Sequence, residues 1–271
     1  MSRFLKGVAL FLAFVLVSAL PCAACGEELR GYSKNLKPRY QYVRMGTYPY
    51  EADGTARDVL WQILSVDGHE ALLFCDLILD VHQVILCDNK KDSEKRNFRR
   101  LTDYTQSDLY TWMNSEMVST LFGDDPMVRA LVETPYGVLY PLTDEQMLTP
   151  AYGFSAGRYG EYPERRCKAT PYAKSIKMYP DWGQKLYVYD SYGTSPYWVI
   201  GFKSKTEANI MMQLCGYDGH LSWGVYTRTG VGVRPALTLD LNMCTVTGGT
   251  GTSEDPFVFT FTGDRYADLL P

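Results

Sequence analysis

The clearest pattern near the start of the chain is a pair of apolar, β-branched runs at residues 59–66 and 70–75. Asp67-Gly68 stands between them, and Asp-Gly is favoured in tight turns whose twist matches that of paired strands. The pattern therefore predicts a β-hairpin over residues 58–76. His69 is expected to be exposed at the edge of that turn.

Apolar residues then recur at helical spacing after residue 107, which predicts an amphipathic helix. Ser107 can cap its first turn, Asp108 suits the positive end of the helix, and Gly123 can end it. The apolar positions on its one face are Leu109, Trp112, Met113, Met117 and Leu121.

Two shorter helical segments are predicted from their first residues. Asp125 followed by Pro126 is typical of a helix start, and the segment is expected to stop before Pro135. Thr143 and Gln146 have the spacing of a capping box, which predicts a brief helical turn.

The remaining strand signals lie mostly late in the chain. Asp218-Gly219 predicts a second hairpin, and the sequence shows no linker or repeat that would divide the chain. Strands early, helices in the middle and strands late indicate an α+β fold: one antiparallel twisted sheet, two main helices and long loops. The predicted strands are residues 138–142, 197–202, 210–214, 221–226, 233–241 and 257–261.

Residues 150–198 have a different character, because apolar periodicity fades and tyrosine becomes frequent. Glycine and proline punctuate the stretch. This composition predicts long ordered loops laid over the sheet, and loops on a rigid scaffold are where binding sites usually lie.

The N-terminus has the pattern of an export signal. Arg3 and Lys6 precede an apolar run at residues 8–20, which is short for a membrane-spanning helix. Cleavage after Ala24 would release the protein, whereas lipidation of Cys25 would tether it to a membrane face; a retained anchor is a third route. The expected organisation is a signal peptide at 1–24, a polar lead-in at 25–40, one domain at 41–262 and a tail at 263–271.

Composition narrows the classes of function. The chain is 46% hydrophobic and 21% charged, which is ordinary for a folded protein. Its net charge of −4 shows no basic excess for binding nucleic-acid phosphates, so no nucleic-acid partner is predicted. The seven cysteines allow no pairing to be assigned; Cys75 and Cys87 lie in apolar surroundings and are expected to be buried thiols.

Seven segments in the same order resemble the DUF6273 domain, a bacterial family of unknown function. They are residues 43–49 (VRMGTYP), 61–64 (WQIL), 71–80 (ALLFCDLILD), 104–114 (YTQSDLYTWMN), 139–143 (LYPLT), 166–173 (RCKATPYA) and 232–237 (GVRPAL). The family is similar to the formylglycine-generating-enzyme and C-type-lectin-like fold, which implies a twisted antiparallel sheet with long loops. This chain lacks the arginine that often follows the family's tryptophan strand, here at Trp198.

Catalytic patterns are sparse. Residues 153–157 (GFSAG) match a nucleophile elbow around Ser155, with Asp190 or Asp218 and then His220 following in the expected order. No strand leads into Ser155 and no helix leaves it, so a glycine-rich loop is the alternative. The three histidines have no zinc-binding spacing, and the sequence predicts no cofactor and no metal.

We expect Arg234, in the Gly-Val-Arg-Pro segment, to be structural, because its donors can bind several loop carbonyls or a carboxylate. Tyrosine and tryptophan offer flat apolar faces with a polar group, which suits sugars and proteins alike; the alternative is that many of these rings pack over the sheet and fill the loop layer. The rings selected as ligand-binding candidates are Trp182, Tyr187, Tyr189, Tyr192, Trp198 and Trp223.

The resulting hypothesis is a non-catalytic, exported binding or scaffold module at the bacterial cell surface. Its expected partner is a glycan or a surface protein, and its membrane contact is limited to the signal or the lipid anchor. The alternative hypothesis is a serine hydrolase that uses Ser155 and His220.

Overall fold

The computed structural model describes residues 40–82, 103–176, 192–204, 210–223 and 230–263, which form two β-sheets. The larger sheet has seven strands in the order β11-β12-β1-β2-β3-β10-β5, and its neighbours are antiparallel except for β1 and β12. Its strands are β1 (Tyr42–Pro49), β2 (Ala56–Asp67), β3 (Glu70–Cys75), β5 (Tyr140–Pro141), β10 (Pro235–Asp240), β11 (Cys244–Gly248) and β12 (Phe257–Phe261).

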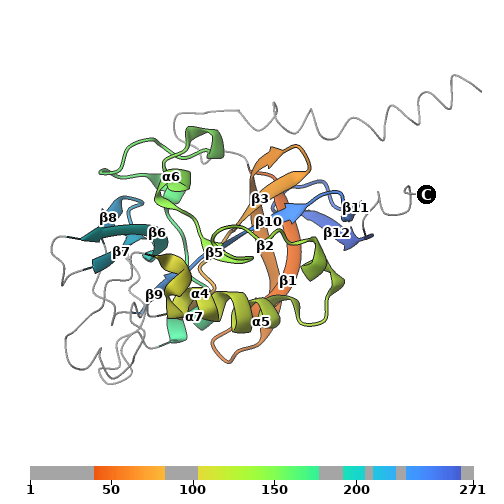
Figure 1. Ribbon diagram of the computed structural model, residues 1–271. Coiled ribbons are helices and arrows are strands. Elements are labelled where there is room, and N and C mark those ends of the chain that lie inside the picture. The colour runs from red at the N-terminus through yellow and green to blue at the C-terminus, as the bar shows by residue number, and fades with distance from the viewer. Residues whose placement is uncertain (1–39, 83–102, 177–191, 205–209, 224–229, 264–271) are drawn as a thin grey trace, which may run out of the picture.

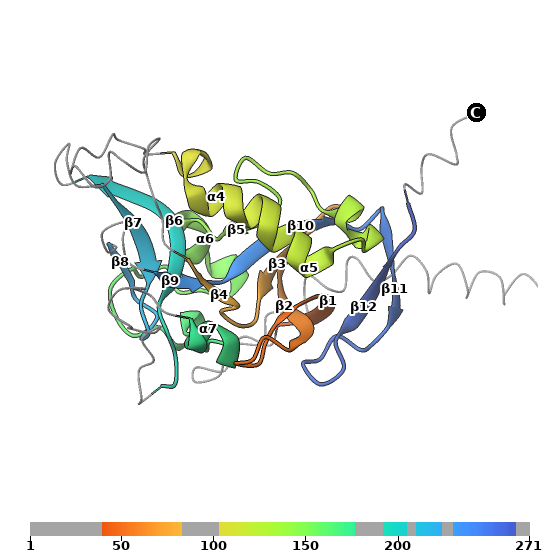
Figure 2. The same cartoon turned by 90° about the horizontal axis from the view of Figure 1, so that it is seen from below.

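The smaller sheet has five strands in the order β4-β9-β6-β7-β8, and only β6 and β9 run parallel. Figures 1 and 2 show strands β6 to β8 at one end of the molecule and the hairpin of β11 and β12 at the other. The strands are β4 (Asp80–His82), β6 (Tyr197–Ser204), β7 (Ile210–Cys215), β8 (Leu221–Trp223) and β9 (Val231–Val233).

A two-stranded ribbon joins the sheets. The chain passes from β3 into β4 and from β9 into β10, so each arm of the ribbon contributes one strand to each sheet. The pairing register changes at the crossing, because Phe74 pairs with Ala236 but Asp80 pairs with Val233. Arg234 occupies this crossing, between β9 and β10.

One long helix lies across the molecule (Figure 2). It consists of α4 (Asp108–Trp112), a wider π-helical turn, η2 (Met113–Met117), and α5 (Val118–Phe122). The Ser107 side chain accepts a hydrogen bond from the Tyr110 amide, and Gly123 ends the helix with a positive φ of 52°, as the sequence predicted. The apolar face is buried through Leu109, Met113, Met117 and Leu121.

The other helical segments are short. Asp125 caps η3 (Pro126–Ala130), and Thr143 and Gln146 form both hydrogen bonds of the predicted capping box at α6 (Asp144–Met147). The prediction of two main helices is therefore wrong, because the second is a single 3-10 segment. The remaining segments are η1 (Tyr104–Gln106), η4 (Pro150–Tyr152), η5 (Pro163–Arg165) and α7 (Pro171–Ser175).

The α+β class is confirmed, but the single sheet is not. Strands β10 and β12 lie in the sheet of the early hairpin as expected, and β11 extends that sheet, whereas β6 to β9 form a separate sheet with β4. The first hairpin is confirmed with its turn one residue later: Asp67 pairs with Glu70, so Gly68 and exposed His69 form the loop. The predicted strand at 233–241 begins after Arg234, and β1, β4 and β11 were not predicted.

The core between the elements is dominated by large aromatic and aliphatic side chains. Trp61 is fully buried on β2, and its indole Nε1 donates to the Met45 carbonyl at 2.8 Å, so its one polar atom is satisfied. Phe74 on β3 lies 6.4 Å from Phe154 in a loop and 6.3 Å from Tyr197 on β6, in edge-on or tilted contacts that join both to the larger sheet. No helix in the described ranges is long and apolar enough to cross a membrane.

Candidate functional site

The six aromatic residues predicted to bind a ligand lie in different environments, and some lie outside the described residues. Trp182, Tyr187 and Tyr189 lie outside the described residues, as does Cys25. The Trp223 backbone belongs to β8, while its side chain is outside the described part of the chain. Tyr192 is half-buried at the surface, and Trp198 is buried.

The prediction that Trp198 meets a ligand is wrong for this structure. Its ring is only 1% exposed, and its indole Nε1 donates to the His82 carbonyl at 2.8 Å. The physical reason is its place on β6, which lies inside the smaller sheet between β9 and β7. Trp198 therefore joins that sheet to the end of β4 instead of facing solvent.

Tyr192 forms a surface cluster with Glu161 and Arg166, called the Tyr192 cluster below. The Tyr192 hydroxyl and the Arg166 guanidinium each donate to Glu161 Oε2 at 2.9 Å. The guanidinium also lies 3.6 Å from the centre of the Tyr192 ring, a cation–π distance. Arg166 Nε donates to the Asp218 carbonyl at 3.3 Å, which fixes the cluster to the turn between β7 and β8.

Buried Arg165 supports the loops beneath this cluster. Its guanidinium donates to the carbonyls of Ser155 and Gly219 and lies 4.4 Å from the Tyr162 ring centre. Gly219, at a φ of +88°, packs so closely on the Tyr162 backbone that a side chain there would collide with it. The loops at 155–166 and 216–220 are thus held as one layer.

Tyr159 is the most exposed large ring in this layer. It is 69% exposed, and its carbonyl accepts a hydrogen bond from the Tyr162 hydroxyl at 3.1 Å. Tyr159 belongs to the tyrosine-rich stretch at residues 150–198, but it was not among the six rings predicted to bind a ligand. Glu161 and Arg166 were also missed, because their contact with Tyr192 spans 26 to 31 positions and has no local signal.

The Tyr192 cluster combines the groups that recognise polar rings. The Glu161 side chain is 66% exposed, and within the described chain both of its hydrogen bonds are accepted by Oε2, which leaves Oε1 to accept one from a ligand. Arg166 supplies donors, and the same loop layer exposes the aromatic ring of Tyr159. Such a set suits the hydroxyl groups and apolar faces of a sugar, or a polar protein loop.

The geometry gives little support to Ser155 as a nucleophile. Ser155 lies in a loop with no strand before it and no helix after it, so the elbow is absent from this segment. His220 Nδ1 pairs with Asp218 Oδ1, as an acid–base pair would. Among the described residues, however, no recorded hydrogen bond joins Ser155 Oγ to His220; Asp190 lies outside them.

Arg234 is buried at the ribbon crossing and its donors are used internally. Nε donates to the Cys75 carbonyl at 2.7 Å, and the two terminal nitrogens donate to Tyr197 Oη and Gln62 Oε1 at 3.3 Å each. The guanidinium also lies 3.8 Å from the Phe74 ring centre. This is the arrangement expected of a structural arginine, with carbonyl and side-chain acceptors in place of a carboxylate.

A second buried polar group, not predicted from the sequence, is Asp80 on β4. Its Oδ2 accepts from the Tyr48 hydroxyl at 2.5 Å and its Oδ1 from the Val81 amide at 2.7 Å. Burial raises the pKa of the Asp80 carboxyl above its usual range, although both hydrogen bonds oppose the shift. The only sequence signal was an aspartate closing the apolar run at residues 71–80.

Asp80→Asn is expected to change the pH dependence of stability. A carboxyl whose pKa is raised in the folded state stabilises the fold below the unfolded-state pKa, near pH 4, and loses that contribution as pH rises through the folded-state pKa. The free energy of unfolding of the variant minus that of the native protein should therefore increase with pH above about 4. Urea unfolding across a pH series measures it; a constant or falling difference would disprove the buried-carboxyl assignment.

The cysteines within the described residues lie in the protein interior. Cys75, Cys167, Cys215 and Cys244 are buried, which confirms the expectation for Cys75; Cys87 is outside the described residues. Burial raises the pKa of the Cys215 thiol to about 12 and also raises that of Cys75. In the part of the chain that the structure describes, no group of three or more His, Cys, Asp or Glu side chains is placed to hold a metal.

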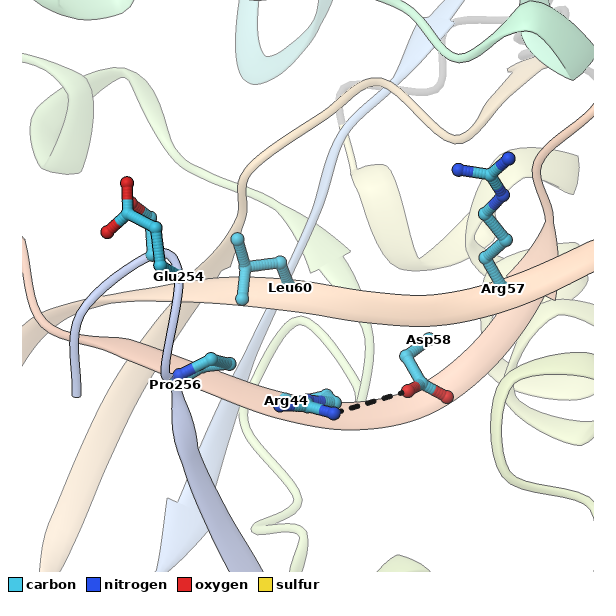
Figure 3. Close-up of a pocket in the computed structure, with 7 residues that line it drawn as sticks. Arg44, Arg57, Asp58, Leu60, Glu254 and Pro256 are labelled. Carbon is cyan, nitrogen blue, oxygen red and sulfur yellow. Dashed lines mark ion pairs between the residues drawn. The ribbon is translucent and has the colours of Figure 1, made fainter. Parts of the chain in front are cut away.

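A hollow of about 540 Å³ lies between strands β1 and β2 and the turn before β12 (Figure 3). Arg44 and Asp58, which form an ion pair across 3.8 Å, line it together with Arg57 and Glu254. Two basic and two acidic side chains balance the local charge, so the hollow favours no one class of ion. It was not predictable, because its residues come from three separate segments.

Comparisons with protein-family models, curated proteins and solved structures gave no match to this chain. The resemblance to the DUF6273 domain, and through it to the lectin-like fold, therefore rests on the sequence motifs quoted above.

Proposed function

We propose that this chain is a non-catalytic, exported binding or scaffold module at the bacterial cell surface, related to DUF6273 domains and to the C-type-lectin-like group. Its ligand is a glycan or a surface protein. The observation that carries the proposal is the Tyr192 cluster, which joins an aromatic ring, a carboxylate and a guanidinium on a loop layer that also exposes Tyr159.

The framework of the fold supports this reading. The loop layer rests on buried Arg165 and on the turn between β7 and β8, so its polar groups are held before a ligand arrives. Preorganised groups lose less conformational entropy on binding. The export pattern at residues 1–24 would deliver such a surface to the outside of the cell.

Arg166→Ala is the direct test of this surface. A glycan array or a pull-down from cell-wall extract should identify a ligand of the native protein. The variant should bind this ligand at least about tenfold more weakly, because it loses the charged hydrogen bonds of Arg166 to the ligand and the hydrogen bond from Arg166 to Glu161. Retention on the array indicates a glycan, and retention of a protein indicates a surface partner.

Lys168→Ala is the matched control, because Lys168 is an exposed basic residue in the same segment outside the cluster. It should bind as the native protein does. Equal binding by the native protein and Arg166→Ala, with both folded, would show that the Tyr192 cluster is not the site.

A further inference from the structure

The hollow between β1, β2 and the turn before β12 presents charges of both signs around an apolar side chain. Arg44, Asp58 and Glu254 line it, and in Figure 3 Leu60 lies between Glu254 and the pair formed by Arg44 and Asp58. Its volume of about 540 Å³ is within the range of small-molecule sites. Because its charges balance, it suits a small molecule that itself carries both signs better than a simple anion or cation.

Arg44 and Asp58 leave hydrogen-bonding capacity for such a molecule. Their closest nitrogen–oxygen distance is 3.8 Å, longer than a hydrogen bond, and the two side chains are 44% and 60% exposed. Exposed ion pairs of this kind contribute little. An α-amino acid has its carboxylate and its ammonium group on one carbon, so both can bind side by side, the carboxylate to Arg44 and the ammonium to Asp58. The new arginine–carboxylate contact can be bidentate, which the existing pair is not.

The fourth charged side chain of the hollow, Arg57, is engaged elsewhere. Its guanidinium forms an ion pair with Glu51, which does not line the hollow, and lies 4.6 Å from the centre of the Tyr50 ring. Glu254 is exposed, and among the described residues no recorded ion pair or hydrogen bond involves its carboxylate. Glu254 therefore remains open to a second cationic group of the ligand.

The turn that carries Glu254 is held in place before a ligand arrives. The amides of Thr250 and Gly251 donate to the Asp255 carbonyl at 3.0 and 2.9 Å. The Tyr42 amide donates to the Gly251 carbonyl at 2.8 Å, which joins the turn to the start of β1. A carboxylate on a fixed turn loses less conformational entropy when it binds a cation.

We propose that this hollow binds a free basic α-amino acid, such as lysine. Arg44 binds the carboxylate, Asp58 the α-ammonium and Glu254 the side-chain ammonium, while the alkyl chain lies on partly buried Leu60. None of these residues belongs to the Tyr192 cluster, so the inference does not depend on the function proposed above. The contacts are exposed to solvent, so we expect a dissociation constant of about 1 mM.

A saturation-transfer NMR titration of the protein with L-lysine tests the site. Binding should saturate with a dissociation constant of about 1 mM or below. L-Norleucine, which is lysine without its side-chain amino group, should bind about fivefold more weakly, because it cannot reach Glu254 with a charge. Absence of saturable binding by L-lysine up to about 20 mM, or equal binding of the two amino acids, overturns the proposal.

Three exposed substitutions assign the contacts. Glu254→Gln should weaken lysine about fivefold and leave norleucine unchanged, whereas Arg44→Gln should weaken both amino acids. Glu145→Gln removes an exposed carboxylate on α6, outside the hollow, and should bind as the native protein does. A Glu254→Gln or Arg44→Gln protein that is folded by thermal unfolding and binds lysine as the native protein does contradicts the assignment.

Discussion

Arg234→Ala is expected to lower the free energy of unfolding by about 3–5 kcal/mol. The change removes donors from the Cys75 carbonyl, Tyr197 Oη and Gln62 Oε1, all at the buried crossing between the sheets. It also leaves a void against the Phe74 ring. Urea denaturation followed by tryptophan fluorescence measures the loss.

Two variants sharpen this test. Arg234→Lys should recover little stability, because an ammonium group cannot reproduce the planar, forked geometry that reaches three acceptors. Arg129→Ala removes an exposed arginine and should change the free energy of unfolding by less than about 0.5 kcal/mol. An Arg234→Ala protein as stable as Arg129→Ala would show that the crossing does not depend on this side chain.

Arg165→Ala should lower the free energy of unfolding by about 2–4 kcal/mol and loosen the loop layer in particular. The buried guanidinium binds the carbonyls of Ser155 and Gly219, which belong to two different loops. Hydrogen exchange measured by mass spectrometry should become faster at residues 155–166 and 216–220, while β2 and β3 keep their protection.

The control for this variant is Lys168→Ala, an exposed substitution close by in sequence, which should leave exchange unchanged. Faster exchange throughout the chain in Arg165→Ala would mean that Arg165 supports the whole fold. Unchanged exchange at both loops would mean that it supports neither.

The two arginines act through one shared residue. Arg234 donates to the Tyr197 hydroxyl at 3.3 Å, and that hydroxyl donates to the Arg165 carbonyl at 2.7 Å. The ribbon crossing between the sheets is thereby linked to the loop layer that carries the Tyr192 cluster. Buried Arg234 is therefore connected to the surface Tyr192 cluster through Tyr197 and Arg165.

Features with local causes were predictable from the sequence. The caps at Ser107, Asp125 and Thr143 follow from side chains that bond amides two or three residues away. The last strand, Phe257–Phe261, has the predicted bounds, because glycine and proline mark its start and its apolar run is short. The first hairpin was predicted from Asp67-Gly68, and only the turn position differed.

Features that depend on distant pairing were not predictable. The division into two sheets follows from the register change between β3–β10 and β4–β9, which no local pattern encodes. Trp198 has the composition of a binding residue, but neighbours on both sides of β6 bury it. The Tyr192 cluster joins Glu161 and Arg166 to a residue far along the chain, so loop composition indicated a surface without identifying its members.

Hydroxyl-radical footprinting with cell-wall extract tests the recognition surface most directly, since labelling of a tyrosine ring falls when a ligand covers it. We expect Tyr159 and Tyr192 to lose labelling when the extract is added, while half-buried Tyr136, outside the loop layer, keeps its own. Unchanged labelling of Tyr159 and Tyr192, or an equal loss at Tyr136, would contradict the proposal that this loop layer binds a ligand.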